Sequence, residues 1–167
     1  MSGPALYDQI IQKLRTTSDV THVLRCLEEL DETIFSAKTP IEKGEIFREV
    51  PKDIADMLTA AFINLPATPE NKIVLKREID DLSDRLRGCK NIQLTIAFHP
   101  DEETITFFSE WVKKNVSPTI LIDLQFDKTI VGGAQIIANG VFKDYSVRKK
   151  LANRFQIQRE DIVALLD

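Results

Sequence analysis

The sequence is poor in the residues that most often carry chemistry. Its 167 residues include only two histidines, two cysteines and one tryptophan. Cys26 and Cys89 stand far apart, with no CxxC spacing and no histidine beside either, so neither a zinc motif nor a redox motif is encoded. We expect reduced thiols, and a disulfide between the two cysteines stays open as the alternative.

Long apolar runs and a surplus of positive charge are also missing. No run of about 18 apolar residues exists, which excludes an encoded transmembrane helix. Residues 1–8 lack the basic and apolar regions of a signal peptide and the arginine-rich face of a transit peptide, so we expect the protein to work where it is made. A formal net charge of -4 gives no general attraction to nucleic acid.

What the sequence does contain is a helical pattern up to about Gly88. Apolar residues recur there at helical spacing, which predicts an antiparallel bundle of amphipathic helices over residues 1–90. Ser18 or Asp19 is expected to cap the second helix, Thr68 to cap the last, and Gly88 to end it as a left-handed cap. The apolar stripes of the five expected helices begin at Leu6, Val20, Ile46, Ile54 and Leu75.

From Asn91 onward the pattern changes to alternation, which is typical of strands. A strand near 92–98 is followed by a helix that Asp101 can cap, and then by a strand near 120–126 that can run parallel to the first. Asn139-Gly140 predicts a tight hairpin, since both turn residues need positive φ. We therefore predict an α+β protein, in which a small mixed β-sheet domain with packed helices occupies residues 91–167.

No catalytic, cofactor-binding or metal-binding residue is predicted. His22 and His99 have no carboxylate or cysteine at ligand spacing. Gly132-Gly133 matches no phosphate-loop pattern, and a β-bulge or a tight crossing of backbones explains it better. Ser146 lacks the GxSxG elbow of hydrolases and is expected to cap the following helix. The acidic clusters at 80–81 and 101–103 are expected to be solvated.

A basic stretch near the C-terminus allows two interpretations. Its apolar residues, Val147, Leu151 and Phe155, can dock the helix and leave the charges in water. Alternatively, the charges can attract an acidic partner helix or an anionic lipid surface. The basic residues are Lys143, Arg148, Lys149, Lys150, Arg154 and Arg159.

The segment from Ile92 to Leu151 resembles the C-terminal domain of the delta subunit of F-type ATP synthases, the family of the mitochondrial oligomycin-sensitivity-conferring protein. That family has a strand that reaches an Asp, an apolar pair, a glycine pair, a strand, a tight turn and an Asp-Gly-Ser-Val-Arg-x-x-Leu segment. Tyr145 replaces the glycine of that last segment. The matching residues are Asp127, Gly132, Gly133, Asp144, Ser146, Arg148 and Leu151.

The resemblance implies a non-catalytic stator subunit without a cofactor. In that family the helical bundle grips the N-terminal helices of the alpha subunits, and the C-terminal domain holds the b subunits of the peripheral stalk. The lack of a transit peptide favours a bacterial cell, where we expect a peripheral position on the cytoplasmic face of the plasma membrane, reached only through the complex. The net charge leads us to expect no nucleic-acid partner.

A bundle of short helices can leave an apolar groove into which a partner helix fits. The candidates to line such a groove can equally be plain bundle core; they are Leu6, Ile10, Leu14, Ile54, Leu58 and Phe62. Two other functions stay open: a stator or adaptor subunit of another rotary ATPase or export machine, and a small cytosolic enzyme that uses His99.

Overall fold

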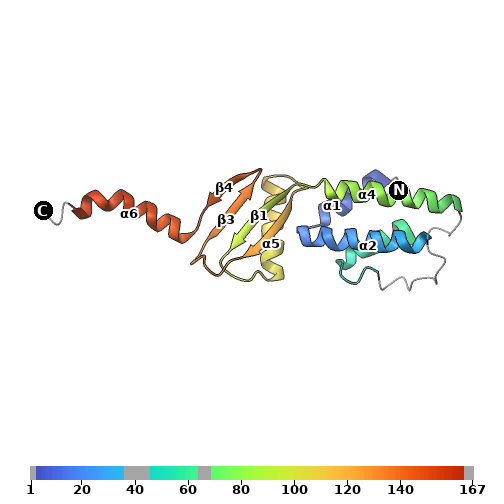
Figure 1. Ribbon diagram of the computed structural model, residues 1–167, viewed down its shortest axis with the longest axis horizontal. Coiled ribbons are helices and arrows are strands. Elements are labelled where there is room, and N and C mark those ends of the chain that lie inside the picture. Colours follow the sequence, from blue (N-terminus) through green and yellow to red (C-terminus); the bar gives the residue numbers. More distant parts are fainter. Residues whose placement is uncertain (1–2, 36–45, 64–68, 164–167) are drawn as a thin grey trace.

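The chain has an α+β fold in which a group of helices is followed by a small mixed sheet, as the sequence predicts. The computed structural model describes residues 3–35, 46–63 and 69–163. The helices lie at one end of an elongated molecule, the sheet lies in the middle, and a last helix extends to the other end (Figure 1).

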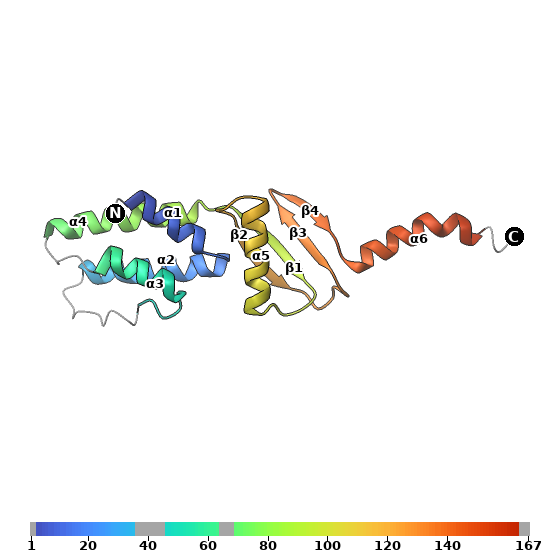
Figure 2. The same ribbon diagram turned by 180° about the vertical axis from the view of Figure 1, so that it is seen from behind.

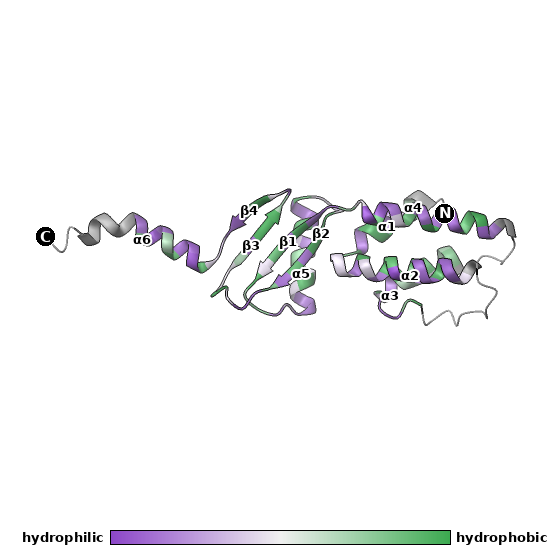
Figure 3. Ribbon diagram, viewed as in Figure 1, coloured by the Kyte–Doolittle hydropathy of each residue, from purple (hydrophilic) through white to green (hydrophobic). Residues whose placement is uncertain are grey.

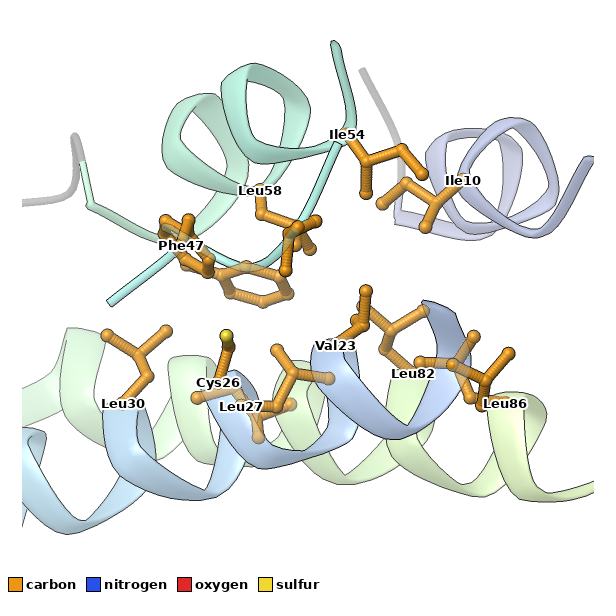
Figure 4. Packing of buried hydrophobic residues seen from close by; sticks show 14 of the residues in the cluster. Ile10, Val23, Cys26, Leu27, Leu30, Phe47, Ile54, Leu58, Leu82 and Leu86 are labelled. Atoms are coloured by element: carbon orange, nitrogen blue, oxygen red, sulfur yellow. The ribbon is translucent and has the colours of Figure 1, made fainter. Parts of the chain in front are cut away.

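The helical part consists of α1 (Gly3–Lys13), α2 (Thr17–Phe35), α3 (Lys52–Leu58) and α4 (Pro69–Arg87). A π-helical turn, η1 (Thr59–Ile63), directly continues α3. Their apolar stripes meet in one core (Figure 4), because each stripe leaves water only by packing on the others. Residues that are almost wholly buried there include Ile10, Val23, Leu27, Ile54, Leu58 and Leu82.

The short helix expected after Pro40 differs from the prediction where it is described. Residues 46–49 are turns, so Ile46 and Phe47 are not helical as expected, and the earlier part of that helix lies outside the described residues. Both side chains are nevertheless buried in the core, and the N–H of Val50 donates to the carbonyl of Phe47 at 3.2 Å. Pro51 follows directly, and a residue before proline is disfavoured in the helical region. The side chains of Ile46 and Phe47 are therefore buried although these residues are not helical.

Two helix ends differ from the prediction. The cap of α2 is Thr16: its hydroxyl accepts from the N–H of Asp19, whose carboxylate in turn accepts from the N–H of Thr16, each at 3.1 Å. This is the reciprocal arrangement of a capping box. Gly88 was expected to be left-handed, but among the described residues only Gly133 and Gly140 are glycines with positive φ. Thr68, the expected cap of α4, lies outside the described residues.

The sheet contains β1 (Asn91–Ile96), β2 (Leu121–Phe126), β3 (Ala134–Ala138) and β4 (Val141–Asp144) in the order β2-β1-β3-β4. Strands β1 and β2 are parallel, as their connection through a helix predicts, whereas β3 is antiparallel to both β1 and β4. The hairpin between β3 and β4 turns at Asn139 and Gly140, with φ of 51° and 75°. This prediction is confirmed.

Helix α5 (Glu102–Asn115) crosses one face of this sheet (Figure 2). The carboxylate of Asp101 accepts from the N–H of Thr104 at 2.8 Å and so caps the helix as predicted. Val112 packs against Leu94, Ile96 and Ile122 in a second, smaller core. Apolar and polar residues alternate along β1, and Figure 3 shows the hydropathy of all the strands by colour.

The last helix, α6 (Val147–Val163), follows β4 after a sharp elbow at Tyr145 and Ser146. Gly133 lies directly against this elbow. With φ of 86°, a Cβ added to Gly133 would stand 2.5 Å from the carbonyl oxygen of Tyr145 and 3.0 Å from the Cα of Ser146. The predicted tight crossing of backbones is therefore present, and it leaves no room for a side chain.

Gly133→Ala should destabilise the protein by about 1–3 kcal/mol more than Gly140→Ala in urea unfolding. Gly140 is the matched control, since its φ is 75° but nothing lies within 4 Å of an added Cβ. Both substitutions introduce left-handed strain, and only the one at Gly133 also displaces the elbow. Equal losses of stability would show that an added Cβ at Gly133 causes no steric clash with the elbow.

Candidate functional site

Two apolar grooves are open on the surface, one in each half of the molecule. The first, which we call the bundle groove, lies between α1, α3, η1 and α4 and has a volume of about 760 Å³. Its floor is apolar, while Asp56 and Glu78 bring two carboxylates to its rim. The π turn contributes small residues, which allow a partner to approach closely. The apolar residues of the groove include Leu6, Met57, Ala60, Ala61, Phe62 and Val74.

The structure places only two of the six predicted groove residues in this groove, Leu6 and Phe62. The other four are at most 1% exposed and belong to the core between the helices; they are Ile10, Leu14, Ile54 and Leu58. These four occupy the centre of their stripes, whereas a groove is lined by the stripe edges. Helical spacing identifies the stripe but not its edge.

One side of the bundle groove is held by a polar contact. The hydroxyl of Tyr7 donates to the carboxylate of Glu78, which ties α1 to α4 across the groove. The guanidinium of Arg85 lies over the ring of Tyr7, 5.6 Å from its centroid. Because Tyr7 is on α1 and Arg85 is on α4, this cation–π contact stabilises the packing of the same two helices. The two helices that form these walls, α1 and α4, are therefore held together by contacts within the chain.

The second groove, the sheet groove, lies between α5 and the part of the sheet that α5 does not cover. Its volume is about 720 Å³, and Lys143 is the one charged residue among the described residues that line it. Trp111 and Phe107, on α5, form one wall and are 54% and 64% exposed. The floor comes from the strands, with Ile92, Leu94, Ile136 and Val141.

The strand register explains why this floor is continuous. Leu94 pairs with Ile136, which pairs with Lys143, and Ile92 pairs with Ala138, which pairs with Val141. Paired residues of neighbouring strands point to the same face, so these rows run from β1 to β4. Helix α5 packs over β1 and β2, which leaves the half of this face over β3 and β4 without cover. An apolar surface of this kind is typical of an interaction site.

The residues of the resemblance gather at the elbow that begins α6. Asp144 accepts a hydrogen bond from the N–H of Ser146 at 2.8 Å, and the hydroxyl of Ser146 accepts from the N–H of Lys149 at 3.2 Å. The N–H of Val147 donates to the carbonyl of Gly132 at 2.9 Å. Asp144, Ser146 and the glycine pair thus fix the direction in which α6 leaves the sheet.

Asp127 serves a separate turn. Its carboxylate accepts from the N–H of Thr129 at 2.8 Å and from the Thr129 hydroxyl at 2.7 Å, which closes the turn after β2. These bonds hold the pKa of Asp127 below its usual value. Arg148 and Leu151 lie on α6 and are exposed.

Helix α6 is not docked on the described part of the chain. Residues 147–156 are all exposed, and the apolar side chains Leu151 and Phe155 are 50% and 64% accessible. The interpretation that this stripe docks the helix is therefore wrong for this structure, because the fixed elbow directs α6 away from the sheet. The basic side chains of Arg148, Lys149 and Lys150 are also exposed on it.

The two histidines have different neighbours. His22 is 3.9 Å from the carboxylate of Glu49, and the ring of His99 stacks on Phe126 with centroids 3.9 Å apart. Cys26 and Cys89 are free, and burial raises the pKa of both thiols. Within the ranges that the structure describes, no group of His, Cys, Asp and Glu could hold a metal ion, and no helix could cross a membrane.

The acidic clusters lie at the surface of helices. Asp80 pairs with Lys76 at 3.0 Å and Asp81 with Arg85 at 3.5 Å, in both cases one helical turn away. Asp101 caps α5, and the hydrogen bonds with Thr104 hold its pKa below the usual value. No cleft brings these carboxylates together among the described residues. Surface pairs of this kind contribute little to stability.

Sequence analysis missed the contacts between the two halves. No contact outside its own helix was expected for Lys113, but its amine donates to the carbonyl of Leu14 at 2.6 Å. Arg15 was assigned no role, yet it reaches Glu102 and Thr106 on α5. A single sequence carries no signal for contacts about 90 residues apart along the chain. Only the Thr16-x-x-Asp19 pattern could have pointed to a structured turn there.

Two open apolar grooves, with the residues of the resemblance in turns, are features of a protein that binds partners. The chain belongs to the family of the ATP synthase delta (OSCP) subunit, whose sequence model matches residues 6–156. Among curated proteins, no match to the chain was found.

Membership defines the function at a coarse level. The family consists of non-catalytic stator subunits of ATP synthase, so this chain is a structural subunit of the peripheral stalk of an F-type ATP synthase. Members bind the alpha subunit and the peripheral stalk, and they associate with the membrane through the complex.

The pKa of Asp144 should lie below its ordinary value of 3.8, mainly because Ser146 donates hydrogen bonds to its carboxylate. Asp144 has a lower pKa in the folded than in the unfolded protein. These bonds therefore stabilise the folded protein fully above the unfolded pKa, and this stabilisation is lost as the pH falls through the folded pKa. Carboxyl chemical shifts measured by NMR against pH should show this midpoint. Ser146→Ala should move it back up, and a wild-type midpoint at or above 3.8 would contradict the elbow geometry.

Proposed function

We propose that the chain links the catalytic head of the ATP synthase to the b-subunit stalk through its two grooves. The bundle groove takes an N-terminal helix of the alpha subunit, and the sheet groove takes a helix of the b subunits. The proposal is carried by one observation: each half of the molecule has an open apolar groove of about 720–760 Å³. An amphipathic helix can lay its apolar face into such a groove.

The link matters because the rotor turns inside the head. A head that turned with the rotor would couple no rotation to ATP synthesis, so the stator must hold it against torque. Such a grip depends on a slow dissociation rate, which buried apolar anchors supply better than exposed charges do. The exposed aromatic residues of the sheet groove, Phe107 and Trp111, are anchors of this kind.

The charges at the two grooves favour different partners. Asp56 and Glu78 stand at the bundle groove, so its partner helix should be basic beside its apolar stripe. Lys143 lines the sheet groove, and the basic start of α6 lies next to it, so its partner should be acidic there. Complementary charge speeds association and rejects the wrong partner more than it adds affinity. The two helices should therefore not exchange places.

Val74→Glu should weaken binding of a peptide from the N-terminus of the same organism's alpha subunit by at least about tenfold. Val74 lines the bundle groove and is 52% exposed, so the substitution adds a charge near Glu78 without opening the core. Ile73→Glu is the matched control, because Ile73 is next to Val74 on α4 and is 64% exposed but does not line the groove. Calorimetric titration measures both variants.

This experiment has two outcomes that count against the proposal. The wild-type protein should bind the peptide tightly, and heat below detection at high micromolar peptide would exclude this groove as the head contact. Equal weakening by the two variants would mean that the peptide binds elsewhere on α4.

Trp111→Ala should weaken binding of a helical b-subunit peptide by about thirtyfold, the loss expected when a central aromatic anchor is truncated. The matched control is Phe98→Ala, because Phe98 is 51% exposed but does not line the sheet groove. Circular dichroism confirms that each variant is folded before titration. Unchanged affinity in Trp111→Ala would place the stalk contact outside this groove.

A further inference from the structure

The turn between α1 and α2 pairs with the sheet. Thr16 forms a parallel bridge with Ile122, and the N–H of Ile122 donates to the carbonyl of Arg15 at 3.1 Å. Strand β2 is the edge of the sheet at this side, so the turn acts as a short fifth strand supplied by the helical half. The backbone of one half is therefore hydrogen-bonded into the other, in addition to the covalent link at residues 88–90.

Lys113, on α5, makes a second contact with the helical half at the same place. Its amine donates to the carbonyls of Gln12 and Leu14, the latter at 2.6 Å. These carbonyls belong to the end of α1, where backbone acceptors lack partners within the helix and the dipole favours a cation. Burial lowers the pKa of Lys113, while the nearby carboxylate of Asp19 acts in the opposite direction. One side chain of α5 thus caps a helix of the other half.

Arg15 makes the reverse contact, from the helical half to α5. Its guanidinium donates to the carboxylate of Glu102 at 2.9 Å and to the hydroxyl of Thr106 at 3.1 Å. The carboxylate of Asp19 accepts from the N–H of Arg15 at 3.0 Å, which holds the turn itself in shape. The turn is therefore bonded to α5 through Arg15 as well as through Lys113.

An apolar residue completes the contact. Leu121 begins β2, but it is 3% exposed and packs in the core of the helical half. Its N–H donates to the carbonyl of Lys90 at 3.0 Å, so strand and linker are fixed together at this point. Polar, apolar and covalent connections meet along one side of the sheet. A linker alone would allow the halves to swivel, whereas several separated connections do not.

We infer that Lys113 and the Leu14–Thr16 turn lock the two halves into one rigid body and so fix the angle between the bundle groove and the sheet groove. The inference rests on the proposed function, because the angle matters only if both grooves hold partners. Lys113 is a positioning residue in this arrangement. A locked joint passes torque from one partner to the other.

The joint can be tested in the full-length protein without any partner. Backbone ¹⁵N relaxation reports whether α1–α4 and β1–β4 tumble together. The wild type should fit one rotational diffusion tensor, and Lys113→Met should require two. The Met substitution keeps a long apolar stem but removes the amine. Lys114→Met is the matched control, since Lys114 is the exposed neighbour on α5 and should leave one tensor.

Hydrogen exchange provides a second readout at the joint itself. The amide of Ile122 bonds across the joint to Arg15, so its exchange should become about tenfold to a hundredfold faster in Lys113→Met, as for lost hydrogen bonds to a charged group. The amides that join β1 to β3 should exchange as in the wild type, which separates opening of the joint from loss of the sheet. Lys114→Met should change neither.

Two results would overturn the inference: separate tumbling of the halves in the wild type, or a Lys113→Met protein that behaves like Lys114→Met. Should Lys113→Met fail to fold, Arg15→Gln removes the ion pair to Glu102 and is judged by the same readouts. Titration with the two partner peptides keeps the proposals apart. Lys113→Met should bind each peptide as the wild type does, and a wild type that binds neither would sink the proposed function but leave the joint intact.

Discussion

The hydrogen bond from the N–H of Ile122 to the carbonyl of Arg15 is the point where the helical backbone enters the sheet. Edge strands normally leave such donors unpaired, and a protein must cover or pair them. Here the turn after α1 does so, which also buries Leu121 among the helices. This pairing joins the helical half to the sheet next to the linker.

The apolar surface divides into a part that the chain buries and a part that it cannot. The apolar stripes of α1, α2, α3 and α4 pack against one another in one core. The sheet has only one helix across its face, so Trp111, Val141 and Phe107 remain open. Helix α6 adds Leu151 and Phe155 to the exposed apolar residues. Surfaces of this extent are unfavourable for a free monomer and are expected where a subunit meets its neighbours.

Much of the fold could be predicted because it depends on local pattern. Helical spacing located the stripes at Leu6, Val20, Ile54 and Leu75, and alternation located the strands. The Asn139-Gly140 turn followed from the steric rules for positive φ. Gly132-Gly133 was interpreted as either a β-bulge or a tight crossing of backbones because no phosphate-loop pattern surrounds it, and the structure has a crossing at Gly133.

The failures share a different cause. Gly88, Ile46 and the docking of α6 depended on what packs against them, which spacing does not reveal. The groove residues show the same limit: Ile10 and Phe62 are alike in pattern, but only the neighbouring helices decide which of them lines the groove. The contacts of Lys113 with α1 were beyond reach, because they join segments about 100 residues apart in the sequence.

The π turn η1 has a consequence for how this groove can change over evolution. A π turn contains one residue more than the regular helix around it needs, so deleting a single residue there restores the α-helix. Every residue that follows would then be rotated by about 100° around the axis. Phe62, which is 4% exposed and belongs to the helical core, would leave the bundle groove, so the loss of one codon would change the docking surface and the core together.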